Sequence, residues 1–173
     1  ITAGATREPL DPVRFLTNRS SGKMGYALAS EAVRRGARVT LVSGVSTQPP
    51  PNGVHLIPVE TAQEMLQVCL NTLPNVTGII AAAAVADYRP AEAMPHKIKK
   101  QEGESDFTLR LTPNTDIIAE LGRKKSDNVK SIGFAAETQN LLQNATTKLE
   151  RKNLDMIVVN DVLQEGAGFE VDT

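Results

Sequence analysis

A continuous run of small and apolar residues at positions 77–85 limits most strongly what this chain can fold into. A strand without polar alternation is typical of a parallel sheet that is buried on both faces. Strand and helix patterns alternate around this run. Further strands are expected to end at Thr2 and to cover 37–43, 54–59, 107–111, 131–136 and 156–160. Helices are expected at 22–35, after Thr61, from 114 or 115 to 122, and at 140–152. This alternation predicts an α/β fold: a Rossmann-like, doubly wound and mainly parallel sheet with helices on both faces.

The composition narrows the classes of protein further. The 173 residues are 40% hydrophobic, which suits one core, so we expect a single domain over 1–173. A net charge of -1 offers no global attraction for nucleic acid or an anionic membrane. Without a long apolar run, we expect a cytoplasmic protein. The chain opens without Met and stops without a cap or turn, so we expect a piece that is truncated at both ends.

The only cysteine, Cys69, lies in an apolar set at helical spacing. This pattern predicts a packed side chain rather than a nucleophile. A single cysteine also excludes a disulfide framework and a cysteine-based metal site within these residues.

A polar loop joins the first strand to the first helix, with Ser20, Ser21 and Gly22 at its end. Hydroxyls and unpaired amides at a helix N-terminus suit a phosphate or a carboxylate. The alternative is a capped helix that follows a polar loop. The Gly22-Lys23 pair is not a Walker A motif, because Met24 replaces the required Ser or Thr.

The same loop carries Arg14 and Asn18. A guanidinium suits a phosphorylated substrate, although acidic neighbours could take part of the positive charge. The other charged residues of the loop are Arg7, Glu8, Asp11 and Arg19. Asn18 supplies an uncharged donor and acceptor together, and a local Asx turn is the alternative.

The run Ala81, Ala82, Ala83 and Ala84 stands at the end of the central strand, shortly before Asp87. Small side chains leave space in which a flat base could lie against the backbone, with Asp87 at the rim. Tight packing of a helix on the sheet would explain the alanines equally well.

Two groups of lysines complete the candidate site. Lys97 and Lys99 lie in a charged segment near residues 90–111, which we interpret as a flap over a triphosphate, with a solvated face as the alternative. Lys148 and Lys152 share one face of a helix, where like charges repel unless an anion lies between them. A solvated face remains open for these two as well.

Five segments of this sequence resemble phosphopantothenate-cysteine ligase. They are TREPLDPVRFLTNRSSGKMG at 6–25, AAAAVADYRP at 81–90, KIKK at 97–100, GFAAET at 133–138 and KLERKNLDMIVVND at 148–161. The match is closer to the bacterial type, usually the C-terminal half of a bifunctional protein of coenzyme A biosynthesis. The resemblance implies that CTP activates the phosphopantothenate carboxylate as an acyl-cytidylate, with release of pyrophosphate, and that the amine of cysteine then displaces CMP.

The resemblance also implies roles for individual residues. Asn18 matches the catalytic asparagine, Arg14 a position that serves the acid substrate, and Lys97 a flap lysine that also binds the triphosphate. Ser20, Ser21 and Gly22 belong to the substrate loop. The cytidine pocket is matched by Ala81, Ala82, Ala83, Asp87, Thr115, Asp116, Ile117, Ile118 and Phe134, and further triphosphate ligands by Lys148 and Lys152.

The family implies Mg²⁺ or Mn²⁺ carried with the nucleotide, no dedicated metal cage, a homodimer, and FMN only in a fused decarboxylase domain outside this sequence. Two other functions remain as alternatives. A nucleotide-sensing module without catalysis would bind CTP without turnover. An NAD(P)-dependent oxidoreductase fits a Rossmann-like opening, but the second strand ends at Ser43-Gly44 with no acidic residue for the ribose.

Overall fold

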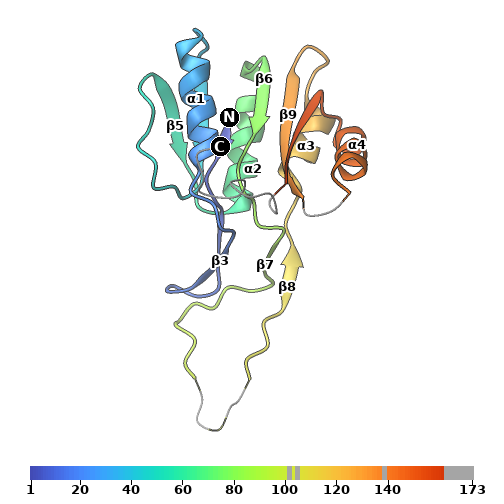
Figure 1. The fold of residues 1–173 in the computed structure, drawn as a ribbon. Helices are drawn as coiled ribbons and strands as arrows, with labels where there is room; N and C mark the ends of the chain where they lie inside the picture. Colours follow the sequence, from blue (N-terminus) through green and yellow to red (C-terminus); the bar gives the residue numbers. More distant parts are fainter. Residues whose placement is uncertain (101–102, 104–105, 138–139, 162–173) are drawn as a thin grey trace.

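The structure, a computed structural model, describes residues 1–100, 103, 106–137 and 140–161. Its centre is a six-stranded parallel sheet in the order β10-β9-β6-β1-β4-β5 (Figure 1). The strands are β1 (Thr2–Ala3), β4 (Val39–Ser43), β5 (Val54–Pro58), β6 (Gly78–Ala81), β9 (Lys130–Glu137) and β10 (Met156–Asp161). The chain builds outward from β1 to β5, returns to β6, and builds outward again to β10. This is the predicted doubly wound order, and its direction reverses between β1 and β6.

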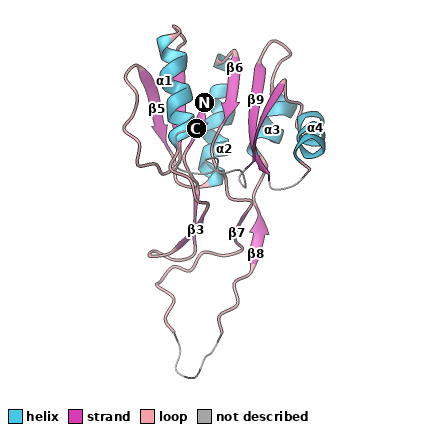
Figure 2. Cartoon of the chain, viewed as in Figure 1, coloured by secondary structure: helices cyan, strands magenta, loops and turns pink. Residues whose placement is uncertain are grey.

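Helices cover both faces of the sheet, as the sequence predicts (Figure 2). They are α1 (Lys23–Arg34), α2 (Ala62–Thr72), α3 (Ile117–Lys124) and α4 (Leu141–Arg151), with a short 3-10 helix η1 (Leu73–Asn75). One core cluster joins α1 to Leu41, and the other joins α2 and α3 to Val42 and Ile79. Because Leu41 and Val42 are consecutive in β4, these two clusters lie on opposite faces. Helix α4 packs on β9 and β10.

Two local predictions for α2 are confirmed. Thr61 caps the helix through a capping box with Glu64, because each residue's side chain accepts from the other's backbone amide. Cys69 is buried in the core, and desolvation raises the pKa of its thiol to about 11. Such a thiol stays protonated near neutral pH and is a packing residue.

Several elements differ from the sequence prediction. Helix α3 covers Ile117–Lys124 rather than 114 or 115 to 122. The expected loop before α1 contains an antiparallel hairpin of β2 (Arg7–Pro9) and β3 (Phe15–Thr17). The strand predicted at 107–111 is wrong, since β8 covers Leu111–Pro113 and pairs with β7 (Tyr88–Pro90). The apolar run at 77–85 is a regular strand only as far as Ala81. Alternation of polar and apolar residues shows which face of a strand is exposed and which is buried. It does not show which other strand it pairs with.

The two small hairpins lie together at one end of the domain. The β2–β3 hairpin contacts β7, and the segment between β7 and β8 projects away from the sheet (Figure 1). This segment includes the charged residues near 90–111 that we interpret from the sequence as a flap, and their role as a flap stays a prediction.

Helix α1 approaches β1 closely through Gly25. A Cβ atom on Gly25 would lie 2.5 Å from the Cβ atom of Ala3 and 3.1 Å from the carbonyl oxygen of Thr2. Only a residue without a side chain fits there, and the contact holds the start of α1 at the carboxyl end of β1.

We expect Gly25→Ala to lower the free energy of unfolding by about 1–3 kcal/mol, because overpacking outweighs the better helix propensity of alanine. Urea denaturation measures this change. Gly78→Ala is the matched control, since its Cβ atom would meet no atom closer than the Lys130 carbonyl oxygen at 3.7 Å. Equal unfolding midpoints for the two variants would contradict this account of α1.

Candidate functional site

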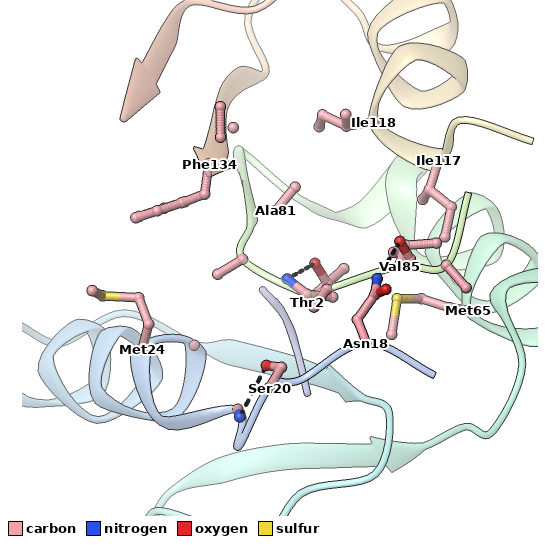
Figure 3. Close-up of a pocket in the computed structure, with 18 of the residues that line it drawn as sticks. Thr2, Asn18, Ser20, Met24, Met65, Ala81, Val85, Ile117, Ile118 and Phe134 are labelled. Atoms are coloured by element: carbon pink, nitrogen blue, oxygen red, sulfur yellow. Dashed lines mark hydrogen bonds between the residues drawn. The ribbon is translucent and has the colours of Figure 1, made fainter. Parts of the chain in front are cut away.

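A cavity of about 980 Å³ opens at the carboxyl ends of β1 and β6, where the strand order reverses. Its walls come from the loop before α1, the segment after β6, the start of α3, β9, α4 and β10. In Figure 3, Met24 and Phe134 lie on one side of this pocket, and Asn18 lies with Val85 on another. A space of this volume suits a nucleotide-sized ligand.

The cavity lies on the side of β1 that faces β6, β9 and β10, and the space between the loops after β1 and β4 is filled. A Cβ atom on Gly4 would lie 2.8 Å from the carbonyl oxygen of Val45, and one on Gly44 would lie 2.3 Å from that of Ala5. Ser46 closes the same edge, since its hydroxyl donates to the carbonyl oxygen of Ser21 at 2.6 Å. Within the described chain, no residue of β4 or β5 lines the cavity.

Asn18 lines the cavity directly after β3. Its side-chain Nδ2 donates to the carbonyl oxygen of Val85 at 3.0 Å (Figure 3). The side chain therefore bridges two walls of the site, and the alternative of a local Asx turn is wrong. This bond also orients the amide, because only its nitrogen can face a carbonyl oxygen.

Ser20, Ser21 and Gly22 line the cavity at the start of α1, as predicted. The hydroxyl of Ser20 accepts from the Gly22 amide at 3.3 Å, and that of Ser21 accepts from the Lys23 amide at 3.4 Å. Gly22 is the N-cap residue of α1 and makes no side-chain cap bond, so these two contacts are local turns before the helix and the capped-helix alternative is wrong. An anion at this point would have to replace or share these two contacts.

Residues 81–83 lie open to the cavity, but their surroundings limit what a base can bond there. The amides of Ala82, Ala83 and Ala84 donate within the protein, to Thr2 and Gly4. The amide of Ala86 donates to the hydroxyl of Thr6 at 3.0 Å. These alanines therefore offer a flat apolar surface and carbonyl oxygens rather than amide donors. Asp87 lies exposed at the same rim.

The start of α3 forms the facing wall with Thr115, Asp116, Ile117 and Ile118. Asp116 is the N-cap and accepts from the amide of Ala119 at 3.1 Å. Its second carboxylate oxygen lies 2.9 Å from the Nζ atom of Lys152. This ion pair lowers the repulsion that the sequence predicts between the two lysines of α4.

Lys152 is held in place by its backbone as well. A Cβ atom on Gly122 would lie 2.0 Å from the Lys152 carbonyl oxygen, so α3 and the end of α4 touch backbone to backbone. Asn153 reinforces the contact by donating to the Gly122 carbonyl oxygen at 2.8 Å. Lys148, one turn earlier, is half-buried and lines the same cavity.

Arg14 and Lys97 are not brought into this cavity by the described chain. Arg14 lies at the β2–β3 hairpin and pairs with Asp11 at 3.1 Å. Lys97 is exposed on the segment that projects between β7 and β8. The predicted roles of both residues stay predictions. The fifteen other predicted site residues all line this one cavity: Asn18, Ser20, Ser21, Gly22, Ala81, Ala82, Ala83, Asp87, Thr115, Asp116, Ile117, Ile118, Phe134, Lys148 and Lys152.

Sequence reasoning missed several lining residues. Asn114 donates to the carbonyl oxygen of Ala86 at 2.8 Å and accepts from Arg89 at 3.0 Å, so it fixes the turn that carries Asp87. Its position beside Thr115 was the available signal. The other missed residues include Thr2, Arg19, Lys23, Met24 and Asn160.

Neither a metal-binding cluster nor a membrane-spanning helix is found in the described part of the chain. No group of three or more His, Cys, Asp or Glu side chains gathers there as it would around a metal ion. No helix within those residues has the length and apolar character needed to cross a bilayer.

Comparison with known proteins connects this geometry to a family. The family model DFP, described as DNA/pantothenate metabolism flavoprotein C-terminal domain, matches residues 1–173. The Coenzyme A biosynthesis bifunctional protein CoaBC of Bacillus subtilis is 51% identical over 100% of this chain and 42% of its own length. CoaBC of Escherichia coli is 49% identical over 99% of this chain and 43% of its own length. The chain thus spans less than half of these relatives.

Solved structures agree with the sequence comparison. The crystal structure of the C-terminal domain of CoaBC has a TM-score of 0.81 and 48% identity, covering 93% of this chain and 75% of that chain. A Cab2 variant in complex with phosphopantothenate-cysteine has a TM-score of 0.75 at 20% identity, covering 95% of this chain and 72% of that one, and shows the fold alone. The chain belongs to the family of the DNA/pantothenate metabolism flavoprotein C-terminal domain.

Proposed function

We propose that this chain is a phosphopantothenate-cysteine ligase domain of coenzyme A biosynthesis. In the proposed reaction, CTP and 4'-phosphopantothenate give an acyl-cytidylate and pyrophosphate, and cysteine then gives the amide and CMP. One observation carries the proposal: a single cavity gathers the Asn18 loop, the alanine segment and two lysines in a family of coenzyme A biosynthesis proteins.

The cytidine would lie between the alanine segment and Phe134. The small side chains of residues 81–83 allow a ring to approach the backbone, and Phe134 is half-buried with one side open to the cavity. Because most nearby amides are already bonded within the protein, specificity for the base would rely on carbonyl oxygens and on shape. The carbonyl oxygens suit the exocyclic amino group of cytosine, which is a donor.

The triphosphate would lie toward α3 and α4. Lys148 and Lys152 supply positive charge, and the start of α3 contributes a partial positive charge from its amides. The pair between Lys152 and Asp116 keeps this ammonium group in position before the nucleotide binds. Positive charge fixed in advance stabilises pyrophosphate as it departs.

Asn18 would act on the carboxyl group of the acid. When the amine of cysteine attacks the acyl carbon, negative charge develops on the acyl oxygen. The bond to CMP then breaks with its electrons leaving on the phosphate, and the amine nitrogen releases a proton to solvent as the amide forms. A neutral amide can donate to that oxygen without strongly stabilising the ground state. The bond from Asn18 to Val85 supports this role, because it fixes the side chain at the cavity wall.

Mg²⁺, or Mn²⁺ in its place, fits this site as an ion carried on the nucleotide phosphates. The exposed carboxylate of Asp87 lies in the cavity, and hard cations of this kind often take few protein ligands. The ion would supply further neutralisation of the leaving pyrophosphate.

Two rival functions receive less support. An NAD(P)-dependent oxidoreductase would need room for the adenosine ribose near the end of β4, where the backbones around Gly4 and Gly44 approach closely. At the end of β4, Ser43 is buried and bonded to the hydroxyl of Tyr26 at 3.0 Å, so it is not available for a ribose. A nucleotide sensor without catalysis would not need the Asn18 bridge.

The remaining parts of the proposal concern the parent protein. Relatives more than twice as long support a chain fused to a second domain, in which a flavin decarboxylase would bind FMN. We also propose a homodimer in the cytoplasm, without nucleic-acid or membrane partners.

We expect the chain, given CTP, Mg²⁺, phosphopantothenate and cysteine, to release pyrophosphate and CMP in equal amounts. Without cysteine, pyrophosphate release should stop near one equivalent per site, because the acyl-cytidylate has no acceptor. Product chromatography measures both compounds. Binding of CTP without either product would favour the sensor, and a rise in melting temperature with NADH but not with CTP would favour the oxidoreductase.

We expect Asn18→Asp to slow amide formation roughly 100-fold, which is typical for loss of a donor to a developing oxyanion. A carboxylate oxygen would also face the Val85 carbonyl oxygen in place of the present N–H donor. CTP affinity should change much less. Asn71→Asp is the matched control, since Asn71 keeps its acceptor for Gln67 on an exposed helix face. Amide formation at the parent rate would remove Asn18 from the reaction.

We expect Lys148→Gln to raise the Kd for CTP roughly tenfold, because one charge-assisted bond to phosphate is lost. Isothermal titration calorimetry measures the Kd. Lys124→Gln provides the control, because Lys124 is exposed on α3 outside the cavity. Equal affinities for the two variants would place the triphosphate elsewhere.

A further inference from the structure

Two residues expected to take part in the reaction, Arg14 and Lys97, lie outside the cavity on different segments. Arg14 belongs to the β2–β3 hairpin, and Lys97 to the segment between β7 and β8. The side chain of Asp11 lies between these segments and is fully buried. A carboxylate without solvent contact is retained in a fold only where polar partners compensate for the lost hydration.

The two carboxylate oxygens of Asp11 have different partners. Oδ1 accepts from the backbone amides of Val13 and Arg14, each at 2.8 Å, and so closes the turn of the hairpin. Oδ2 accepts from the backbone amide of Ile98 at 3.0 Å and pairs with Nε of Arg14 at 3.1 Å. One oxygen therefore shapes the turn, and the other joins the hairpin to the projecting segment.

The same junction is closed from the other direction. The guanidinium of Arg14 donates to the carbonyl oxygen of Ile98, whose amide is held by Asp11. The amide of Met94 donates to the carbonyl oxygen of Leu10 at 2.8 Å. Lys97 directly precedes Ile98. The bonds to the amide and the carbonyl oxygen of Ile98 therefore fix the backbone from which the Lys97 side chain extends.

Charge at this junction is well matched. Desolvation is the largest single influence and raises the pKa of Asp11, but the amides of Ile98, Val13 and Arg14 and the charge of Arg14 together lower it below its ordinary value. Asp11 is therefore ionised at neutral pH, as an ion pair with Arg14 requires.

We propose that Asp11 is a positioning residue that holds Arg14 and the backbone at Lys97 in one rigid unit through its Oδ2 atom. The proposal rests on the proposed function, because it assigns Arg14 and Lys97 to the ligase reaction. The Arg14 guanidinium and the backbone of Lys97 then keep a fixed distance and orientation relative to each other. The position of each depends on both segments.

Asp11→Asn tests this arrangement. Asparagine keeps an oxygen for the Val13 and Arg14 amides, but its NH₂ group cannot accept from Ile98 or pair with Arg14. Ile98→Pro is the second variant, because it removes the donor on the other segment and also restricts the backbone of Lys97. Asp127→Asn, in an exposed turn, is the matched control.

The first readout is amide hydrogen exchange of the full chain without substrates. In Asp11→Asn, we expect the amides of Ile98 and Met94 to exchange at least tenfold faster than in the parent. In Ile98→Pro, we expect the same increase at the Met94 amide. Asp127→Asn should exchange at the rate of the parent at both amides. Unchanged exchange at these amides would overturn the junction itself.

The second readout is the rate of pyrophosphate release. We expect a roughly tenfold or larger fall in kcat for both variants, with the KM for CTP changed less than about twofold, since misplaced groups slow a step without altering the rest of the site. We also expect Asp11→Asn to lower kcat by a factor at least about threefold smaller when Arg14 is already Gln than when Arg14 is present, because the effects of coupled residues are not additive. An equal loss in both backgrounds would show a merely structural role and refute the proposal. A parent chain that releases no pyrophosphate would refute the proposed function separately.

Discussion

The close approach of the loop after β1 to the loop after β4 determines where a ligand can lie in this domain. Gly4 and Gly44 let the two backbones touch, and Ser46 then bonds across to Ser21. In a doubly wound sheet the ligand crevice lies where the strand order reverses, which here is between β1 and β6. The space between the loops after β1 and β4 is filled by backbone, and the functional groups gather on the side of β6, β9 and β10.

Three side chains at the remaining crevice bond to the backbone of one segment. Thr6, Asn18 and Asn114 come from three separate segments, and each bonds to a backbone group of residues 85–86. The segment after β6 is therefore rigid although regular strand structure ends at Ala81. Rigidity of this kind holds a site in its working geometry before a ligand binds, which reduces the cost of ordering it later.

Much of this arrangement could be predicted from the sequence. The apolar run at 77–85 and the alternating helices predicted the correct sheet type. Only Ile79 of that run is buried, because residues 81–85 line the cavity. The β2–β3 hairpin could not be found this way, since Pro9 and several charged residues mask its short strands. Burial of Glu8 was also unexpected, and its carboxylate accepts from the Ala62 amide at the start of α2. Pairings between distant segments, such as Lys152 with Asp116, depend on topology that local patterns do not contain.

We propose that a nucleotide lies on the β6 side of β1. A crystal structure of the chain with CTP and Mg²⁺ would show where the nucleotide binds. We expect the cytosine against residues 81–83 and the phosphates within hydrogen-bonding distance of Lys148 and Lys152. A nucleotide lodged between β1 and β4, or on a surface away from Asn18, would contradict it.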